Sequence, residues 1–137
     1  MADWDPVVTH NPSTVFPDLA LGATLTAGAG AWDPLGASVE VVAAGDVPAG
    51  DYVVEAIVID TPSAVGIYTV QLYYGDGVAP DVDCGAAKFE IATDAGVLVP
   101  VPIRSGVVPG GTAIRGAISS GAAVADTLNV SCQFRAL

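Results

Sequence analysis

Short apolar segments separated by turn-forming residues most strongly constrain how this 137-residue chain can fold. From residue 19 onwards, stretches rich in Val, Ile, Leu and Tyr alternate with clusters of Gly, Pro and Asp. This spacing is typical of an all-β sandwich or barrel, and no stretch shows the 3.6-residue apolar period of a helix. The candidate strands are residues 19–27, 37–44, 51–60, 66–74, 86–92, 97–103, 112–119 and 126–136.

Two of these candidates, 66–74 and 126–136, also indicate which side faces the core. Their side chains alternate with a period of two, which is the pattern of a half-buried strand. The residues that share the expected inner face are Tyr68, Val70, Leu72 and Tyr74 in the first and Leu128, Val130, Cys132 and Phe134 in the second.

The candidate strand 97–103 is unusual because Pro100 and Pro102 occupy alternate positions in it. Proline has no backbone N–H to donate, so we expect this strand at a sheet edge, where it also blunts pairing with other chains. For the whole chain we predict an all-β fold with about eight strands in an antiparallel β-sandwich. A jelly roll is one arrangement that fits.

Residues 1–18 differ from the rest because they carry Pro6, Pro12 and Pro17 and show no sustained periodicity. Proline fixes its own φ and favours an extended residue before it. We therefore predict an extended N-terminal arm over residues 1–18, followed by one β-sandwich domain over residues 19–137. Trp4 and Phe16 are its candidate anchors, either on a neighbouring subunit or across the chain's own domain.

Charge is distributed unevenly along the chain. Residues 1–87 hold twelve carboxylates and no Lys or Arg, a net −12, whereas residues 88–137 sum to +1 and bring the total to −11. Only 14% of the residues are charged, against roughly 25% in a typical globular domain. A surface so poor in charge suits a protein that buries part of its outside in an assembly. Because an acidic chain repels phosphate, we expect no nucleic-acid partner.

Neither a membrane segment nor a catalytic set is evident. No stretch approaches the roughly 20 apolar residues that cross a bilayer, and the N-terminus lacks the basic and apolar regions of a signal peptide. We therefore expect synthesis in the cytoplasm and no membrane partner. His10, the single histidine, lies in the arm, which is a poor platform for a base beside a nucleophile. We expect no enzymatic activity and no cofactor.

Asp76, Asp81 and Asp83 form the densest acidic cluster, in a Gly-containing loop whose oxygens are the ligands that calcium prefers. The spacing does not match an EF-hand, so a solvated hairpin tip is the favoured interpretation and a calcium site the weaker alternative. Cys84 and Cys132 are expected as free thiols, since cytoplasmic synthesis disfavours a disulfide. Pairing later in an extracellular particle stays open.

Several residues are candidates for contact with partners. Trp32 lies in a Gly-rich loop, Tyr73 alternates away from the core, and aromatic side chains of this kind can also stack on sugars. Arg115 and Arg135 lie in late strands, where outward side chains can meet the carboxylates of a neighbour. The candidate interface residues are Trp4, Phe16, Trp32, Tyr73, Arg115 and Arg135.

These traits together resemble the small virion accessory proteins of tailed bacteriophages, above all capsid decoration or cement proteins with a β-sandwich fold. The resemblance covers the span from Val39 to Phe134, with Val47-Pro48-Ala49-Gly50-Asp51-Tyr52 leading into a long strand and Leu128–Leu137 closing the domain. It is one of general pattern without a diagnostic motif, so no functional residue is carried over.

The resemblance implies a non-enzymatic structural virion protein that binds and stabilises the outer surface of a phage capsid. Its expected partners are the major capsid protein or other virion proteins, together with copies of itself as a dimer or trimer. Its expected location is the virion, after synthesis in the host cytoplasm. The alternatives are a tail, neck or fibre-associated component, or a glycan-binding module for host attachment.

Overall fold

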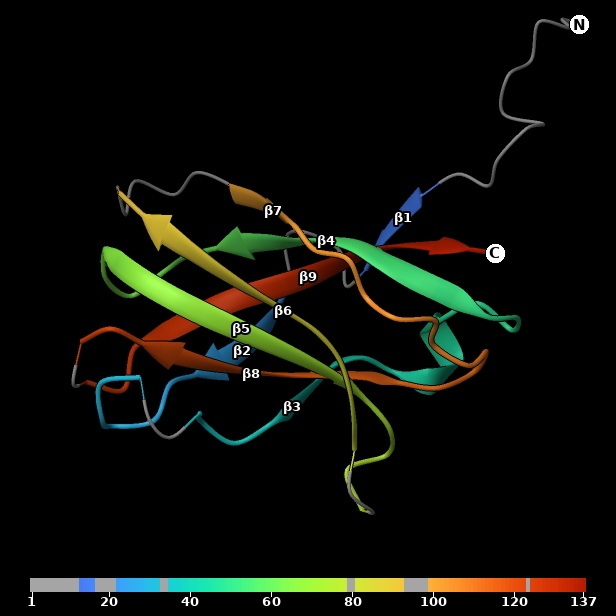
Figure 1. Cartoon of the computed structure of the whole chain (residues 1–137), viewed down its shortest axis with the longest axis horizontal. Helices are drawn as coiled ribbons and strands as arrows, with labels where there is room; N and C mark the ends of the chain where they lie inside the picture. The colour runs from blue at the N-terminus through green and yellow to red at the C-terminus, as the bar shows by residue number, and fades with distance from the viewer. Residues whose placement is uncertain (1–12, 17–21, 33–34, 79–80, 93–98, 123) are drawn as a thin grey trace, which may run out of the picture.

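The computed structural model describes residues 13–16, 22–32, 35–78, 81–92, 99–122 and 124–137. Within these residues the chain forms two antiparallel sheets that pack face to face (Figure 1). One short 3₁₀ turn, η2 (Ala44–Asp46), precedes β4. The strands are β1 (Ser13–Phe16), β2 (Ala23–Thr26), β3 (Val39–Val42), β4 (Tyr52–Asp60), β5 (Gly66–Tyr74), β6 (Val82–Ile91), β7 (Val99–Pro102), β8 (Ile114–Ser120) and β9 (Thr127–Ala136).

The strand order identifies the arrangement as a jelly roll. One sheet runs β1-β9-β4-β7, with β2 also paired to β9, and the other runs β3-β8-β5-β6. The antiparallel pairs are therefore nested around the β5–β6 hairpin: β4 pairs with β7, β3 with β8 and β2 with β9. This wrapping of one long hairpin, β2 to β9, is the double Greek key of a jelly roll, and β1 adds a fifth strand to the first sheet. The prediction of an all-β sandwich is confirmed.

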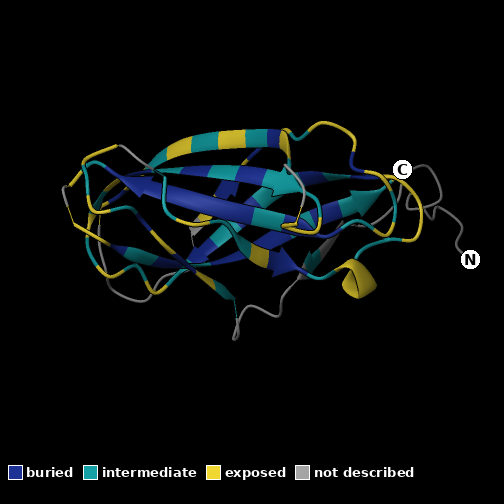
Figure 2. Cartoon of the chain, turned by 90° about the horizontal axis from the view of Figure 1, so that it is seen from below, coloured by how far each residue is buried: buried dark blue, intermediate teal, exposed yellow. Residues whose placement is uncertain are grey.

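The core lies between the two sheets and follows the predicted alternation. Leu128, Val130, Cys132 and Phe134 all point inward and are buried, as are Tyr68, Val70 and Leu72 of β5. Figure 2 shows this as buried positions that alternate along the strands with half-buried and exposed ones. Ser131 departs from the pattern because it faces outward and is nevertheless buried.

The edge prediction for the proline-containing strand is confirmed, since β7 pairs only with β4 among the described strands. Pro100 and Pro102 lie opposite Val58 and Ala56.

The strand at the N-terminus was missed. β1 pairs with β9 from Ser13 opposite Arg135 to Phe16 opposite Cys132, so part of the predicted arm is a strand of the domain itself. Residues 1–12 and 17–18 of the arm lie outside the described residues.

The connections gather at the two ends of the sandwich (Figure 1). At one end, called the cleft end here, the β3–β4, β5–β6 and β7–β8 connections meet. Gly75 N donates to Ala113 O and Gly111 N donates to Pro48 O across them. At the opposite end, called the Asp126 end, the β2–β3, β4–β5 and β8–β9 connections meet. There Ala27 N donates to Asp126 O and Ser63 N donates to Thr127 O.

Candidate functional site

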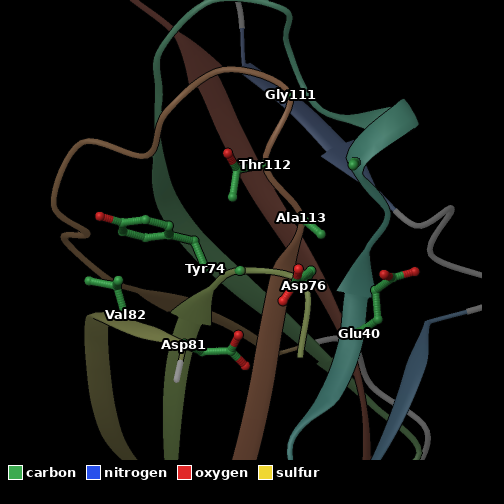
Figure 3. Close-up of a pocket in the computed structure, with 10 residues that line it drawn as sticks. Glu40, Tyr74, Asp76, Asp81, Val82, Gly111, Thr112 and Ala113 are labelled. Atoms are coloured by element: carbon green, nitrogen blue, oxygen red, sulfur yellow. The ribbon is translucent and has the colours of Figure 1, made fainter. Parts of the chain in front are cut away.

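An open cleft of about 520 Å³ lies at the cleft end. Figure 3 shows the carboxylates of Glu40, Asp76 and Asp81 around it, together with the ring of Tyr74. Glycines at the turns leave backbone exposed on the remaining sides. The lining residues are Glu40, Ala44, Tyr74, Gly75, Asp76, Asp81, Val82, Gly111, Thr112 and Ala113.

Asp81 is held in place by Arg115. Its Oδ2 lies 3.3 Å from Arg115 Nε, and its Oδ1 accepts a hydrogen bond from Gly77 N at 3.1 Å. Arg115 Nη2 donates in turn to Ser38 O at 2.9 Å. The β5–β6 turn lies directly on this guanidinium, because a Cβ at Gly77 would approach Arg115 Cζ to 2.9 Å. Gly77 also has a φ of +78°, which favours glycine. Arg115 is therefore engaged within its own chain.

The other two aspartates of the acidic cluster have separate roles. Asp76 Oδ1 accepts from Val78 N at 2.9 Å and shapes the turn. Asp83 lies inside β6, exposed and opposite Tyr73, rather than in the loop. Within the described part of the chain, no group of three or more His, Cys, Asp or Glu side chains is placed to hold a metal ion. The structure thus gives Asp81 an ion pair and Asp76 a turn contact.

A second cavity of about 410 Å³ lies beside β4 and contains two of the four basic residues. Arg135 Nε pairs there with Glu55 Oε1, and Ile103 N donates to Glu55 O. The register of β4 shifts between Val54 and Ala56, so Glu55 lies in a bulge. Arg104 is exposed at the rim of this cavity. Like Arg115, Arg135 has a carboxylate partner in its own chain.

Trp32 and Lys88 form a further cluster on the outer face of the β3-β8-β5-β6 sheet. Lys88 Nζ lies 4.6 Å from the centre of the Trp32 ring, within the range of a cation–π contact. Trp32 has a φ of +64°, rare for a residue with a side chain. Its side chain remains 41% exposed, and its ring packs over Gly121. Sequence patterns identified Trp32 but gave no signal for Lys88.

The remaining candidates are placed as follows. Tyr73 is half-buried on the outer face of β5, and burial, then Asp83 and Asp81, raise the pKa of its hydroxyl. Phe16 lies in β1, opposite Cys132. Trp4 and His10 lie outside the described residues.

Both cysteines are free thiols enclosed in the core. Burial raises the pKa of the Cys84 thiol to about 11, with a smaller contribution from Asp83. Burial, with a smaller contribution from Cys84, raises that of Cys132 to about 12. The expected free state agrees with the structure, and a protonated buried thiol is unreactive.

The outer face of the β1/β2-β9-β4-β7 sheet carries small side chains. Glu55 and Arg135, which pair with each other, lie at one end, and Asp60 lies at the other. Between them the described outward residues are uncharged. They form what is called the uncharged face here: Thr24, Ala56, Val58, Pro100, Pro102, Asn129 and Gln133, with Ser131 buried among them.

Comparisons with known proteins assign no family to this chain. No family model and no curated protein matches the sequence. A chain in the solved structure of infectious bursal disease virus, Gx strain, is similar over 93% of this chain, with a TM-score of 0.34 and 14% identity. The match spans 29% of that chain, so this protein covers less than a third of its length. In the described part of the structure, no helix has the length and apolarity needed to span a membrane.

Proposed function

We propose that this chain is a non-enzymatic structural virion protein that binds and stabilises the outer surface of a phage capsid. The observation that carries the proposal is the uncharged face. The chain has a net charge of −11, yet this sheet surface carries no charged side chain. Such a surface has no charged side chain to desolvate on docking, and two of its polar side chains, Thr24 and Asn129, already hydrogen-bond to each other.

The distribution of charge supports the same role. Arg115 and Arg135 pair with Asp81 and Glu55 of their own chain. Neither arginine is therefore available to neutralise the other carboxylates of the acidic surface. A net charge of one sign keeps the protein soluble and disfavours nonspecific association, while specific contacts, such as those to a shell, can still form. A protein that binds only the assembled shell stabilises it by mass action, by about 2.7 kcal/mol per site at a hundredfold excess over Kd.

The test adds purified protein to capsids that lack it and measures binding and resistance to heat. We expect binding and a higher disruption temperature with the wild-type chain. Val58→Lys places a charge in the middle of the uncharged face, between Ser131 and Pro100, and is expected to abolish binding. Ile67→Lys adds the same charge on the outer face of the other sheet, opposite Glu90, and should bind normally. Absence of binding by the wild type overturns the proposal.

A glycan-binding role is the second candidate, and it rests on the exposed ring of Trp32. A ring of this kind is a platform for the apolar face of a sugar, and Lys88 beside it is a hydrogen-bond donor. A glycan array with the wild type and Trp32→Ala distinguishes this role. Loss of a glycan signal in the variant supports it, and no signal from the wild type excludes it.

A further inference from the structure

β6 presents the longest free edge of the sandwich. It is the last strand of its sheet and pairs only with β5 among the described strands. Near its start, Gly106 N donates to Cys84 O and covers part of the edge. From Ala86 to Ile91 no described residue pairs with it on the open side. A row of unpaired N–H and C=O groups is a template for another strand.

The other edges are less suited to pairing. β7 carries Pro100 and Pro102, β3 has four residues and a register shift, and β1 and β2 divide their edge between two short strands. β6 is ten residues long, with its register shift confined to the end near Cys84. In its described open part, the devices that blunt an edge are limited to two charged side chains, Lys88 and Glu90.

The outward side chains of this edge are self-complementary. Lys88 and Glu90 are exposed on the same face, two positions apart. On the β5 side they lie opposite Thr69 and Ile67, so β5 offers neither a charge partner. Lys88 Nζ lies 4.6 Å from the Trp32 ring, and the proposed pairing replaces this exposed contact with a carboxylate of the second copy. If a second β6 pairs antiparallel about a two-fold axis at Phe89, each Lys88 lies directly opposite the other copy's Glu90. Opposite charges at such positions attract, and each contact is made twice.

The inner face fits the same register. Ala87 and Phe89 are half-buried and pack against the margin of the core. In the two-fold pairing the two Phe89 rings come together, and Ala87 lies opposite Ile91. The exposed margin of each core is thereby covered by the margin of the other, which adds apolar burial to the backbone hydrogen bonds.

We propose that the chain forms a symmetric dimer in which two β6 strands pair antiparallel about Phe89 and join two four-stranded sheets into one of eight strands. Matched Lys88–Glu90 contacts fix the register, because a shift by two residues places like charges or uncharged residues opposite each other. This inference does not rest on the virion role, and it stands or fails separately.

The test is sedimentation equilibrium of charge variants across a range of protein concentrations. Lys88→Glu gives an edge with two acidic residues and Glu90→Lys one with two basic residues. Each should weaken self-association about tenfold or more, because two attractive pairs become repulsive. An equimolar mixture of the two variants restores opposite charges at every pair and should form a heterodimer at least as tight as the wild type. The double variant, which swaps the two charges, should also dimerise.

Two controls carry the same change in net charge away from the edge centre: Arg104→Glu for Lys88→Glu, and Asp46→Lys for Glu90→Lys. Both residues are exposed, and both variants should dimerise nearly as well as the wild type. A measurement without substitution is hydrogen exchange, in which residues 86–91 should become protected as concentration rises while β3 does not. A monomeric wild type, unimpaired single variants, or a mixture that stays monomeric overturns the proposal.

Discussion

The two ends of the sandwich use different interactions to hold their connections together. At the Asp126 end a buried carboxylate accepts hydrogen bonds from Ser120 Oγ at 2.9 Å and Ser63 Oγ at 3.2 Å. At the cleft end an ion pair, Arg115 with Asp81, holds the turn while leaving an open cleft beside it. Hydrogen bonds to a buried carboxylate contribute more than an ion pair that water can partly reach, and the side chains of the Arg115–Asp81 pair are 17% and 12% exposed. The Asp126 end is therefore expected to be the rigid one.

Each end also has a buried tyrosine whose hydroxyl holds a loop. Tyr68 Oη donates to Ala64 O and Tyr52 Oη donates to Thr112 O, both at 2.6 Å. Both rings are fully buried, but Thr112 lines the cleft. The two hydrogen bonds have equal length, and that of Tyr52 adjoins the open cleft, so they allow a matched comparison of the two ends.

The largest effect is expected from Asp126→Ala. It removes the acceptor of two serine hydroxyls at a site that is 8% exposed, and hydrogen bonds to a charged group are worth about 1.5–3 kcal/mol each. Because Ser63 can regain water, we expect a loss of about 3 kcal/mol in the free energy of unfolding, measured with urea. Asp126→Asn, which retains one acceptor oxygen, should lose less. A loss below about 1 kcal/mol for the alanine variant would contradict the ranking of the ends.

The tyrosine pair gives the next effect. Tyr68→Phe leaves the Ala64 carbonyl without its donor and should cost about 1–2 kcal/mol. Tyr52→Phe should cost less, about 0.5–1 kcal/mol, because water in the cleft can reach the carbonyl of Thr112. Thermal unfolding of the two variants gives the order directly. Equal or reversed losses would show that the cleft end is as dry as the Asp126 end.

The strands could be predicted from sequence, but these end contacts could not. Alternation in Leu128–Phe134 and the prolines at positions 100 and 102 report on a strand's own surroundings, so they correctly gave a buried face and an edge. β1 was missed because prolines flank it and four residues are too few to show a period. Asp126 meets Ser63, and Arg115 meets Ser38, across 63 and 77 residues. Only the folded topology brings such pairs together, and no local sequence pattern predicts them.

Arg115→Met tests the ion pair at the cleft end. The variant keeps the apolar stem and removes the charge, and we expect a loss of about 1 kcal/mol, most of it from the hydrogen bond to Ser38 O. The side chains of Arg115 and Asp81 are 17% and 12% exposed, so added salt should reduce the difference only in part. Arg135→Met is the matched control, since its pair with Glu55 is about twice as exposed and should contribute less. A larger loss of unfolding free energy for Arg135→Met than for Arg115→Met would show that the more exposed ion pair contributes more, contrary to this expectation.

The smallest effect concerns the thiols, which report local opening. Cys84 lies near the start of β6 at the cleft end, whereas Cys132 lies in the middle of the core. Burial favours the neutral thiol in the folded state, so this contribution to stability is complete below pH 9 and is lost as pH rises through 11 and 12. Below pH 9, the rate at which the two thiols are labelled therefore reports local opening of the folded protein. It does not report unfolding caused by ionisation of the thiols. Arg115→Met should raise the labelling rate of Cys84 a few-fold and leave Cys132 unchanged, whereas Asp126→Ala should act on the two thiols alike. If Arg115→Met accelerates both equally, the cleft end does not open on its own, and the two ends belong to one cooperative unit.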